Sequence, residues 1–371
     1  MSKPHEQHLY LVLDNPKPEE GYNIHKIDVT RNLDPDDTDD LDMRARPLPG
    51  PPLIRVDAKH HRAKLFVAHG TKILAMQRSP GRAAPALDTR TMAITAIPLP
   101  QPSNRQLYYR SAFVSVGDKL YSMDERHFKV LGLGAVGGGS RCRSWRSVPS
   151  PPPFYPGRVA CYAVHPDRRT IFFSVYHGSH LEAPFARPWP RGRVCSDDDY
   201  AGATVSFDTE TLKWTLRGYW KLPFEGQAHY DAELDAWVGL LKGRICTCDV
   251  PPPITGEEDA GEQPKPAQKL GENQLFRHKG RRHRGGALVY MGSSTFCVLE
   301  CVTKDEFTEE QWEKLRSPPP LLLYVRTFGL KYGKEGRLRM ASCGRRAACY
   351  ELPERTNDGE VFMFSLRALW V

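Results

Sequence analysis

This sequence of 371 residues lacks any apolar run as long as a membrane-spanning helix, which needs about 20 residues. Near its start it has one short apolar stretch, Leu9 to Leu13, and no small-residue cleavage site, so no secretory signal is expected. The nine cysteines are scattered and form no C-x-x-C pair, which argues against a structural zinc site. We therefore expect buried free thiols, no membrane attachment and a location in the cytoplasm, the nucleus or both.

Familiar catalytic and nucleotide-binding motifs are also missing. There is no G-x-S-x-G elbow, no P-loop lysine motif and no cysteine in a recognisable catalytic setting. Gly132, Gly134 and Gly137 fit the G-x-G-x-x-G pattern, but the following residues, SRCRSWRSVPSPPP, have no helical period. Because that pattern binds a pyrophosphate only where a helix begins directly after it, we expect a loop inside a repeat and no cofactor.

Three polar clusters have residue types that suit metal binding or acid–base chemistry. His177 and His180 lie three apart in HGSH, which is not the helical spacing of a zinc protease, and no glutamate base accompanies them. Residues 196–200, SDDDY, lack the spaced ligands of a calcium loop. In AHYDAELDAW, residues 228–237, a turn would send alternate side chains to different faces. We expect no catalytic residues and no metal site.

Short strands dominate the pattern, and helical periodicity is rare. Runs such as HLYLVLD, KLFVAHG, TIFFSVY and ATVSFD are rich in β-branched and aromatic residues and end at Gly, Pro, Asp or Asn. The one convincing helix is predicted near 304–316, where Thr303 with Glu306, or Thr308 with Gln311, forms a capping box. Aromatic clusters such as WKLPF, residues 220–224, are expected in the core. These features predict an all-β fold with one short helix between two strands.

One phrase of the sequence recurs. KLFVAHGTKILAM and SAFVSVGDKLYSM share an apolar strand, a glycine turn, a lysine and a second apolar strand, and their glycines, Gly70 and Gly117, lie 47 residues apart. A period of about 45 to 60 residues with roughly four strands indicates a β-propeller blade of the kelch type. We predict a flexible N-terminus over 1–7 and a single β-propeller over 8–371, with about six kelch-like blades and five to seven admissible. Pairing of residues 9–14 with 361–366 would close it.

Charge is unevenly distributed along the chain, which has 52 Lys and Arg against 44 Asp and Glu, a formal charge of +8. An acidic loop is predicted at 34–42, and the apolar-poor segment 251–286 is predicted to be a disordered insert. Its basic end, 277–284, is either a tolerated part of that insert or a patch for polyanion binding or nuclear targeting. Nucleic-acid binding is not expected, because no aromatic residue interleaves the cations. The patch residues are Arg277, Lys279, Arg281, Arg282 and Arg284.

An ordered series of phrases resembles the plant domain-of-unknown-function 1668 family, which is expanded in grasses. The phrases are FVAHGTKILAM, ALDTRT, VGDKLYSMD, FKVLGLG, SWRSVPSPPP, YAVHPDRRTIFFSV, TVSFDTETLKWTLRGYWKLPFEGQAHYDAELDAWVGL and CTCDV. The similarity covers roughly residues 8 to 370. It implies a kelch-like or F-box-associated-like propeller in a plant cell, with no established activity and no catalytic residues to transfer.

Two classes of function follow from this interpretation. The first is a non-enzymatic interaction module, an adaptor or scaffold-like propeller that is monomeric and binds unidentified protein partners through its loops. The alternative is an enzyme with a small-molecule or carbohydrate site at the mouth of the propeller channel. A weaker alternative is polyanion or nucleic-acid binding through the basic loop 277–284, which moderate salt would abolish.

Overall fold

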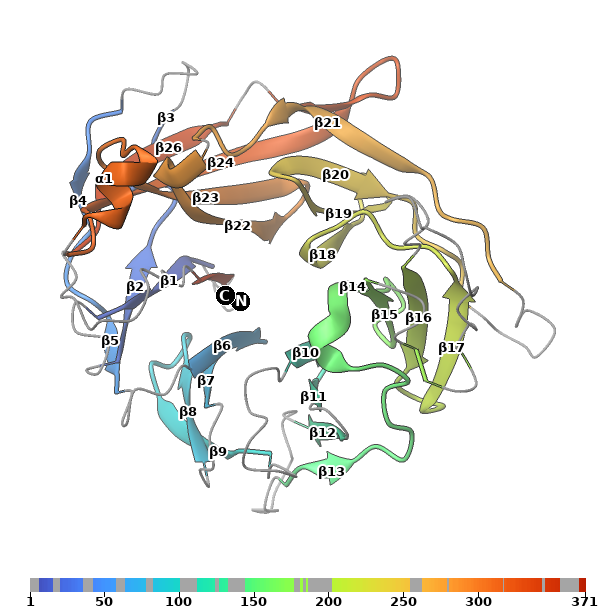
Figure 1. Cartoon of the computed structure of the whole chain (residues 1–371). Coiled ribbons are helices and arrows are strands. Elements are labelled where there is room, and N and C mark those ends of the chain that lie inside the picture. The colour runs from blue at the N-terminus through green and yellow to red at the C-terminus, as the bar shows by residue number, and fades with distance from the viewer. Residues whose placement is uncertain are drawn as a thin grey trace, which may run out of the picture. The chain divides into compact units, whose positions relative to one another are not determined.

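The computed structural model of this chain is built almost entirely from strands (Figure 1). It describes residues 7–15, 21–35, 43–57, 64–77, 83–100, 112–123, 127–132, 144–176, 181–182, 185, 202–253, 262–278, 280–315, 317–341, 344–353 and 367–371. These fall into two compact units, unit 1 (Met1–Gln77, Pro85–Thr95 and Glu272–Val371) and unit 2 (Arg78–Ala84 and Ala96–Gly271). The predicted all-β fold class is confirmed, whereas the prediction of one domain over 8–371 stays a prediction.

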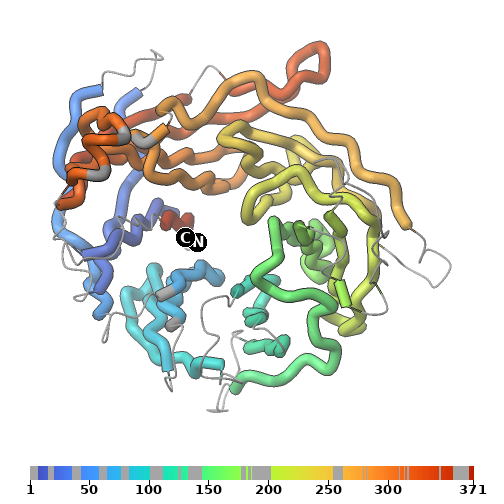
Figure 2. The backbone as a smooth tube through the Cα atoms, in the orientation of Figure 1, coloured from blue at the N-terminus to red at the C-terminus, as the bar shows by residue number. Residues whose placement is uncertain are grey.

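The two ends of the chain meet in one antiparallel sheet of unit 1. Its order is β27 (Arg367–Trp370), β1 (Leu9–Asp14), β2 (Tyr22–Ile27) and β5 (Ile54–Val56). His8 and Val371 exchange main-chain hydrogen bonds of 3.1 and 3.2 Å, and the ends of the tube lie side by side in Figure 2. The terminal strands therefore pair as predicted, but the C-terminal partner is β27. Residues 361–366 lie outside the described part of the chain.

The largest sheet of unit 1 has its two faces in different environments. Its strands are β22 (His283–Gly292), β23 (Thr295–Thr303), β24 (Leu321–Tyr332), β26 (Arg346–Glu351) and β3 (Asp34–Pro35), in that order, with β25 (Leu338–Met340) beside β24 and β4 (Arg46–Pro47) beside β26. Leu299, Leu323 and Val325 lie on one face, in a core with Leu9 and Leu11 of β1. The residues between them point to the opposite face, because side chains alternate along a strand.

The recurring phrase forms the hairpins that the sequence predicted. One sheet has the order β6 (Lys64–His69), β7 (Lys72–Gln77), β8 (Ala83–Asp88) and β9 (Ile94–Pro98), and another β10 (Ala112–Val116), β11 (Lys119–Met123), β12 (Phe128–Gly132) and β13 (Arg146–Ser147). Gly70 and Gly117 have φ angles of +55° and +57° in the turns β6–β7 and β10–β11. Glycine adopts this left-handed conformation without steric cost, which explains the repeated Gly.

Unit 2 contributes most of an eight-stranded sheet. The order is β17 (Lys213–Gly218), β16 (Ala203–Asp208), β15 (Thr170–Val175), β14 (Val159–Val164), β18 (Gly226–Asp231), β19 (Ala236–Leu241), β20 (Arg244–Cys248) and β21 (Gln268–Gln274). Strands β14 and β18 are parallel, so the sheet consists of two four-stranded antiparallel meanders joined side by side. Such a meander is the repeat unit of a β-propeller. Trp220, Leu222 and Phe224 are buried with Trp237, as predicted for WKLPF.

The predicted insert at 251–286 differs from the prediction over its second half, which contains β21. The Asp249 N–H donates to the Ala267 carbonyl at 2.9 Å. The guanidinium of Arg244, on β20, donates to the Gly271 carbonyl of β21. Main-chain pairing and Arg244 therefore hold a strand that has almost no apolar side chains, so hydrophobic periodicity does not reveal it. Residues 254–261 lie outside the described chain, and their disorder stays a prediction.

The helix and the acidic loop match the predictions in part. Helix α1 (Glu309–Glu313) connects β23 to β24, and the Thr308–Gln311 capping box is present, although α1 is shorter than predicted. Asp34 of the acidic loop lies in β3 and its carboxylate is 3.1 Å from the Arg46 guanidinium, while residues 36–42 are not described. No helix in the described ranges is long and apolar enough to span a membrane.

Candidate functional site

One face of the β22–β26 sheet carries charged side chains where a sheet interior normally carries apolar ones. By strand register, Glu300 of β23 lies opposite Tyr324 of β24, and Tyr324 lies opposite Cys349 of β26. In the adjoining row Val298 lies opposite Arg326. Because side chains alternate along a strand, Arg326 shares this face with Tyr324 and Phe328, which lie two residues before and after it on β24. The face therefore places a buried carboxylate and a buried guanidinium next to an aromatic ring.

Glu300 anchors the segment that follows β21 onto this face. Its carboxylate accepts hydrogen bonds from the N–H groups of Arg277 at 3.1 Å and His278 at 2.9 Å, and it is only 1% exposed. Arg326 donates from its guanidinium to the Leu275 carbonyl in the same segment. Two buried charges thus hold residues 275–278 over the sheet, since each takes a main-chain partner from that segment.

The electrostatic surroundings keep Glu300 ionised. The Nδ1 atoms of His283 and His278 lie 3.3 and 3.4 Å from its oxygens, and Arg326 Nη2 lies 4.0 Å away. Burial opposes ionisation, but hydrogen bonds from His283 and from the two N–H groups, with the charge of His278, hold the pKa of Glu300 below its usual value. The carboxylate therefore remains a negative counter-charge beneath Arg326 at neutral pH.

Tyr324 and Cys349 complete the row but provide no activated nucleophile. Burial and the neighbouring Cys349 raise the pKa of Tyr324 to about 12, and burial also raises the pKa of Cys349. A thiol with a raised pKa is mostly protonated at neutral pH and attacks poorly. The rings of Tyr324 and His278 lie 5.2 Å apart, so this end of the face is closed by packing.

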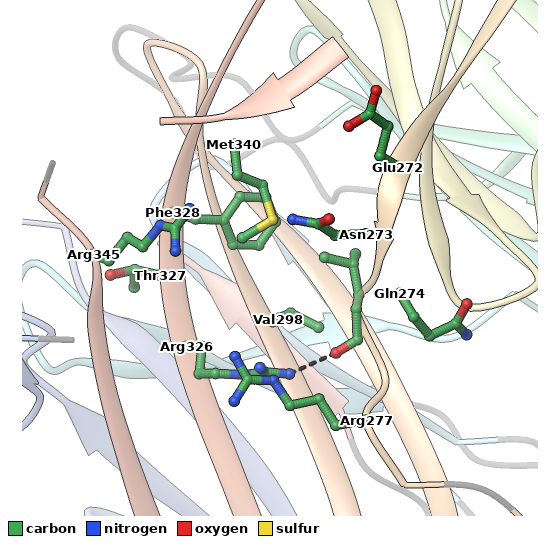
Figure 3. Close-up of a pocket in the computed structure, with 11 residues that line it drawn as sticks. Glu272, Asn273, Gln274, Arg277, Val298, Arg326, Thr327, Phe328, Met340 and Arg345 are labelled. Atoms are coloured by element: carbon green, nitrogen blue, oxygen red, sulfur yellow. Dashed lines mark hydrogen bonds between the residues drawn. The ribbon is translucent and has the colours of Figure 1, made fainter. Parts of the chain in front are cut away.

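Beside Arg326 the covered face opens into a pocket, which we call the arginine pocket. Its volume is about 420 Å³, within the range of roughly 300 to 1,000 Å³ that is usual for ligand sites. In Figure 3 Arg277 and Arg326 are drawn toward one end, and Met340 and Phe328 toward the other, with Arg345 beside Phe328. The lining residues are Glu272, Asn273, Gln274, Leu275, Arg277, Val298, Arg326, Thr327, Phe328, Met340 and Arg345.

The basic residues singled out in the sequence do not share one environment. Arg277 lines the arginine pocket, whereas Arg282 donates to the Thr303 carbonyl at 3.4 Å and to Glu306 at 3.3 Å. Arg284 lies over the ring of Trp312, 4.5 Å from its centroid. Arg281 belongs to the 3-10 turn Gly280–Arg282, and Lys279 is not among the described residues. A shared polyanion or nuclear-targeting patch stays a prediction.

The other sequence candidates fall outside the described chain or have structural roles. His177, His180 and residues 196–200 are not described, and neither are residues 133–140 of the glycine-rich loop. AHYDAELDAW forms the β18–β19 hairpin, where Asp231 accepts from the N–H groups of Glu233 and Leu234 at 3.1 and 2.9 Å. Within the described ranges, no three His, Cys, Asp or Glu side chains are placed to hold a metal ion.

A model of the family described as "Protein of unknown function (DUF1668)" matches residues 6–350, nearly the whole chain. The chain belongs to the DUF1668 family. A search of curated proteins gave no significant match to this DUF1668 protein.

Several solved structures resemble the DUF1668 chain over almost its full length. AztD from Citrobacter koseri is 11% identical with a TM-score of 0.42, covering 98% of this chain and 97% of its own. The periplasmic gluconolactonase PpgL from Pseudomonas aeruginosa is 13% identical with a TM-score of 0.39, covering 98% of each chain. A chain of a nidogen/laminin complex is 11% identical with a TM-score of 0.40, covering 94% of this chain and 99% of its own. Likeness at this level carries no argument about activity.

Sequence reasoning missed Arg326, which lines the arginine pocket of this DUF1668 protein, and Glu300, the buried carboxylate next to Arg326. Glu300 and Arg326 each stand inside an apolar strand run, TFCVLECV and LLLYVRTFGL. A charged residue inside such a run is a signal in itself, because buried charges are rare unless they are paired. That signal indicates a buried pair, but the partner and the pocket depend on the strand register.

Proposed function

We propose that this DUF1668 protein is a non-enzymatic interaction module that binds an acidic segment of a partner protein in the arginine pocket. The observation that carries the proposal is the lining of that pocket, where three arginines stand around an apolar floor. Arg277, Arg326 and Arg345 supply positive charge, and Glu272 at the rim is ion-paired with Arg337 at 3.4 Å. Charge complementarity therefore favours an acidic occupant.

The residue types of the pocket support recognition of a protein. Arginine, methionine and aromatic residues are enriched at protein interfaces relative to the remaining surface. Guanidinium groups bind carboxylates through two parallel hydrogen bonds, which fixes orientation as well as charge. Met340 adapts its shape to an incoming apolar side chain because its thioether side chain is unbranched and flexible. The proposed occupant thus combines an acidic group with an apolar one.

A non-enzymatic role is supported by the state of the candidate nucleophiles. Burial raises the pKa of Cys161 and Cys246 to about 11, and of Cys248 and Cys297 to about 12. A nucleophilic cysteine needs the opposite shift and a base within hydrogen-bond reach. Among the described residues of the arginine pocket, arginine, amide and apolar groups predominate, which suits binding. The alternative is an enzyme with a site at a propeller channel, and the binding experiments below test the interaction module against it.

The same proposal includes where and how the module acts. Six described cysteines are free and buried, which suits a reducing compartment such as the cytoplasm or nucleus. We propose a monomer with a kelch-like propeller architecture, in keeping with the resemblance to a plant family. Binding through one pocket needs no second copy of the chain.

Selection from a displayed library of random nine-residue peptides tests the proposed function with the full-length protein as bait. The pocket variant is Arg277→Glu, which reverses one charge of the pocket and keeps the main-chain N–H that Glu300 accepts. The matched control is Arg339→Glu, the same charge reversal at the exposed neighbour of Met340 on β25. We expect acidic peptides that bind the wild type and the control and lose affinity roughly tenfold on the pocket variant.

Two results would contradict the proposed function. One is that no peptide is enriched above the background of the bait-free selection. The other is that enriched peptides bind wild type, Arg277→Glu and Arg339→Glu alike, which would place binding elsewhere. Urea unfolding of all three proteins, with midpoints that agree, shows that a loss of binding is not a loss of fold.

A further inference from the structure

The alternation of side chains along β24 sets the distance between two residues of the arginine pocket. Arg326 and Phe328 are two residues apart on β24, so they point to the same face roughly 7 Å apart, because each strand residue advances about 3.4 Å. Across the register Val298 lies opposite Arg326, and Phe296 lies opposite Phe328, with the rings of Phe296 and Phe328 6.1 Å apart. Arg326 and the apolar surface of Phe328 therefore lie one strand repeat apart in the pocket.

The opposite wall of the pocket is made by the end of β21, which is itself extended. Asn273 and Gln274 are exposed and line the pocket, and β21 is the last strand in the order of its sheet. Adjacent strand residues point to opposite sides, and in Figure 3 the Asn273 side chain points toward Met340 while Gln274 points away. The Asn273 amide can donate and accept hydrogen bonds, so it matches the main-chain N–H and C=O groups of an extended peptide lying between β21 and the sheet face.

Building on the proposed function, we infer that the bound segment is extended and carries an acidic residue and an apolar residue two positions apart. The carboxylate lies between Arg277 and Arg326, and the apolar side chain lies against Met340 and Phe328. In an extended chain only residues i and i+2 point the same way at this distance. Adjacent residues point to opposite sides, and helical neighbours three or four apart follow a different spacing.

The buried counter-charge favours a carboxylate over a phosphate group. Glu300 lies 4.0 Å from Arg326 and is only 1% exposed, so water screens its charge little. With Arg277 and Arg326 it leaves a net charge of one at that end, which a monoanionic carboxylate neutralises. A dianionic phosphate is attracted more strongly, but it loses more solvation free energy and leaves excess negative charge beside the buried Glu300. The two anions therefore differ in affinity although both attract arginine.

Synthetic peptides of identical composition test the spacing. The reference is acetyl-GSTETLTSG-amide, with glutamate and leucine two apart; acetyl-GSTTELTSG-amide places them one apart and acetyl-GSTETTLSG-amide three apart. Fluorescence anisotropy with the full-length protein measures each dissociation constant. We expect the reference to bind roughly tenfold more tightly than either permutation, and more tightly than its glutamine or phosphoserine counterpart.

A double-mutant cycle assigns the two ends of the pocket. Arg277→Ala is paired with the glutamine peptide, and Met340→Ala with a peptide in which alanine replaces leucine. We expect each matched pair to lose little more than either single change, whereas the crossed pairs lose affinity multiplicatively. Arg339→Ala is the control protein, because Arg339 is exposed and alternates away from Met340 on β25.

The outcomes separate this inference from the proposed function. Equal affinities for the three permuted peptides, or a reference that fails to bind, overturn the spacing, as does tighter binding of the phosphoserine peptide. The proposed function still stands in those cases if library peptides of another pattern lose binding on Arg277→Glu. If library selection finds no peptide that depends on the arginine pocket, both the spacing inference and the proposed function are contradicted.

Discussion

Arg217 in unit 2 and Arg326 in unit 1 are both buried arginines on sheet strands, 2% and 8% exposed, yet their guanidinium groups have different surroundings. Arg217 donates to Ser206 Oγ at 2.7 Å, to the Pro252 carbonyl at 3.0 Å and to Gln263 Oε1 at 3.1 Å. Its guanidinium also lies 4.6 Å from the centroid of the Phe172 ring. Arg326 donates to the Leu275 carbonyl, lies near Glu300 and borders a pocket.

Arg217 has a structural role, because its hydrogen bonds join two segments of the chain, whereas Arg326 lines a pocket. Arg217 joins Pro252 to Gln263, the two flanks of residues 254–261, and Trp220 Nε1 donates to the Gln263 carbonyl at 2.8 Å. Burial lowers the pKa of Arg217 to about 10, which still leaves it charged at neutral pH. Burial alone therefore does not identify a functional arginine. An adjoining pocket is the feature that distinguishes Arg326.

Replacing Arg217 should give the largest loss of stability. Arg217→Ala leaves three acceptors without their donor and removes the cation over Phe172, so we expect the free energy of unfolding to fall by about 4 kcal/mol. Urea unfolding followed by tryptophan fluorescence measures the loss, and amide exchange at Gln263 should accelerate. Arg168→Ala, an exposed change in the same unit, is the control and should shift stability by less than about 0.5 kcal/mol. A similar shift for both variants would show that Arg217 does not hold the flanks together.

Glu300 is the matching test in unit 1. The N–H groups of Arg277 and His278 donate to different oxygens of Glu300, so Glu300→Gln leaves one of them facing an amide NH2 group and also removes the counter-charge of Arg326. We therefore expect a loss of about 2 kcal/mol. Amide exchange should accelerate at Arg277 and His278 rather than at Gln263. Glu306→Gln, whose carboxylate is 80% exposed, is the control. Unchanged exchange at both amides would contradict the anchoring role of Glu300.

Local patterns in the sequence were enough to predict many, but not all, of the elements of the fold. The glycine turns at Gly70 and Gly117 and the capping box at Thr308 are confirmed because each depends on a few adjacent residues. Strand β21 was missed because its support comes from Arg244 and main-chain pairing, neither of which leaves a hydrophobic period. The number of blades stays a prediction, although four-stranded meanders recur along the described chain.

The arginine pocket was beyond prediction for a different reason. Arg277 was singled out by its basic neighbours, but Arg326 and Glu300 were hidden in apolar runs. Their proximity follows from a register that aligns Glu300 with Tyr324, and from a covering segment whose path no periodicity specifies. A single sequence gives strands and turns, whereas a site assembled across strands needs the pairing between them.

The smallest loss of stability is expected when the ion pair of a surface arginine is removed. Arg169 is 39% exposed in its side chain and pairs with the carboxylates of Asp208 and Glu210. Asp208 also accepts from the N–H groups of Glu210 and Thr211 at 2.8 and 3.1 Å in the turn after β16. Asp208→Asn keeps the turn acceptor and removes the ion pair, so we expect a loss of about 0.5 to 1 kcal/mol at pH 7.

The pH dependence of this loss tests its electrostatic origin. Burial opposes ionisation of Asp208, but the hydrogen bonds from Arg169 and the turn N–H groups outweigh it and lower the pKa. A carboxyl with a lowered folded-state pKa stabilises the protein above its unfolded value of about 4 and loses that contribution as pH falls. Urea unfolding of wild type and Asp208→Asn at pH 7, 5, 4 and 3.5 should therefore show a constant difference that shrinks below about pH 4. A difference that persists unchanged at pH 3.5 would mean that turn geometry, and not the charge of Arg169, accounts for the loss.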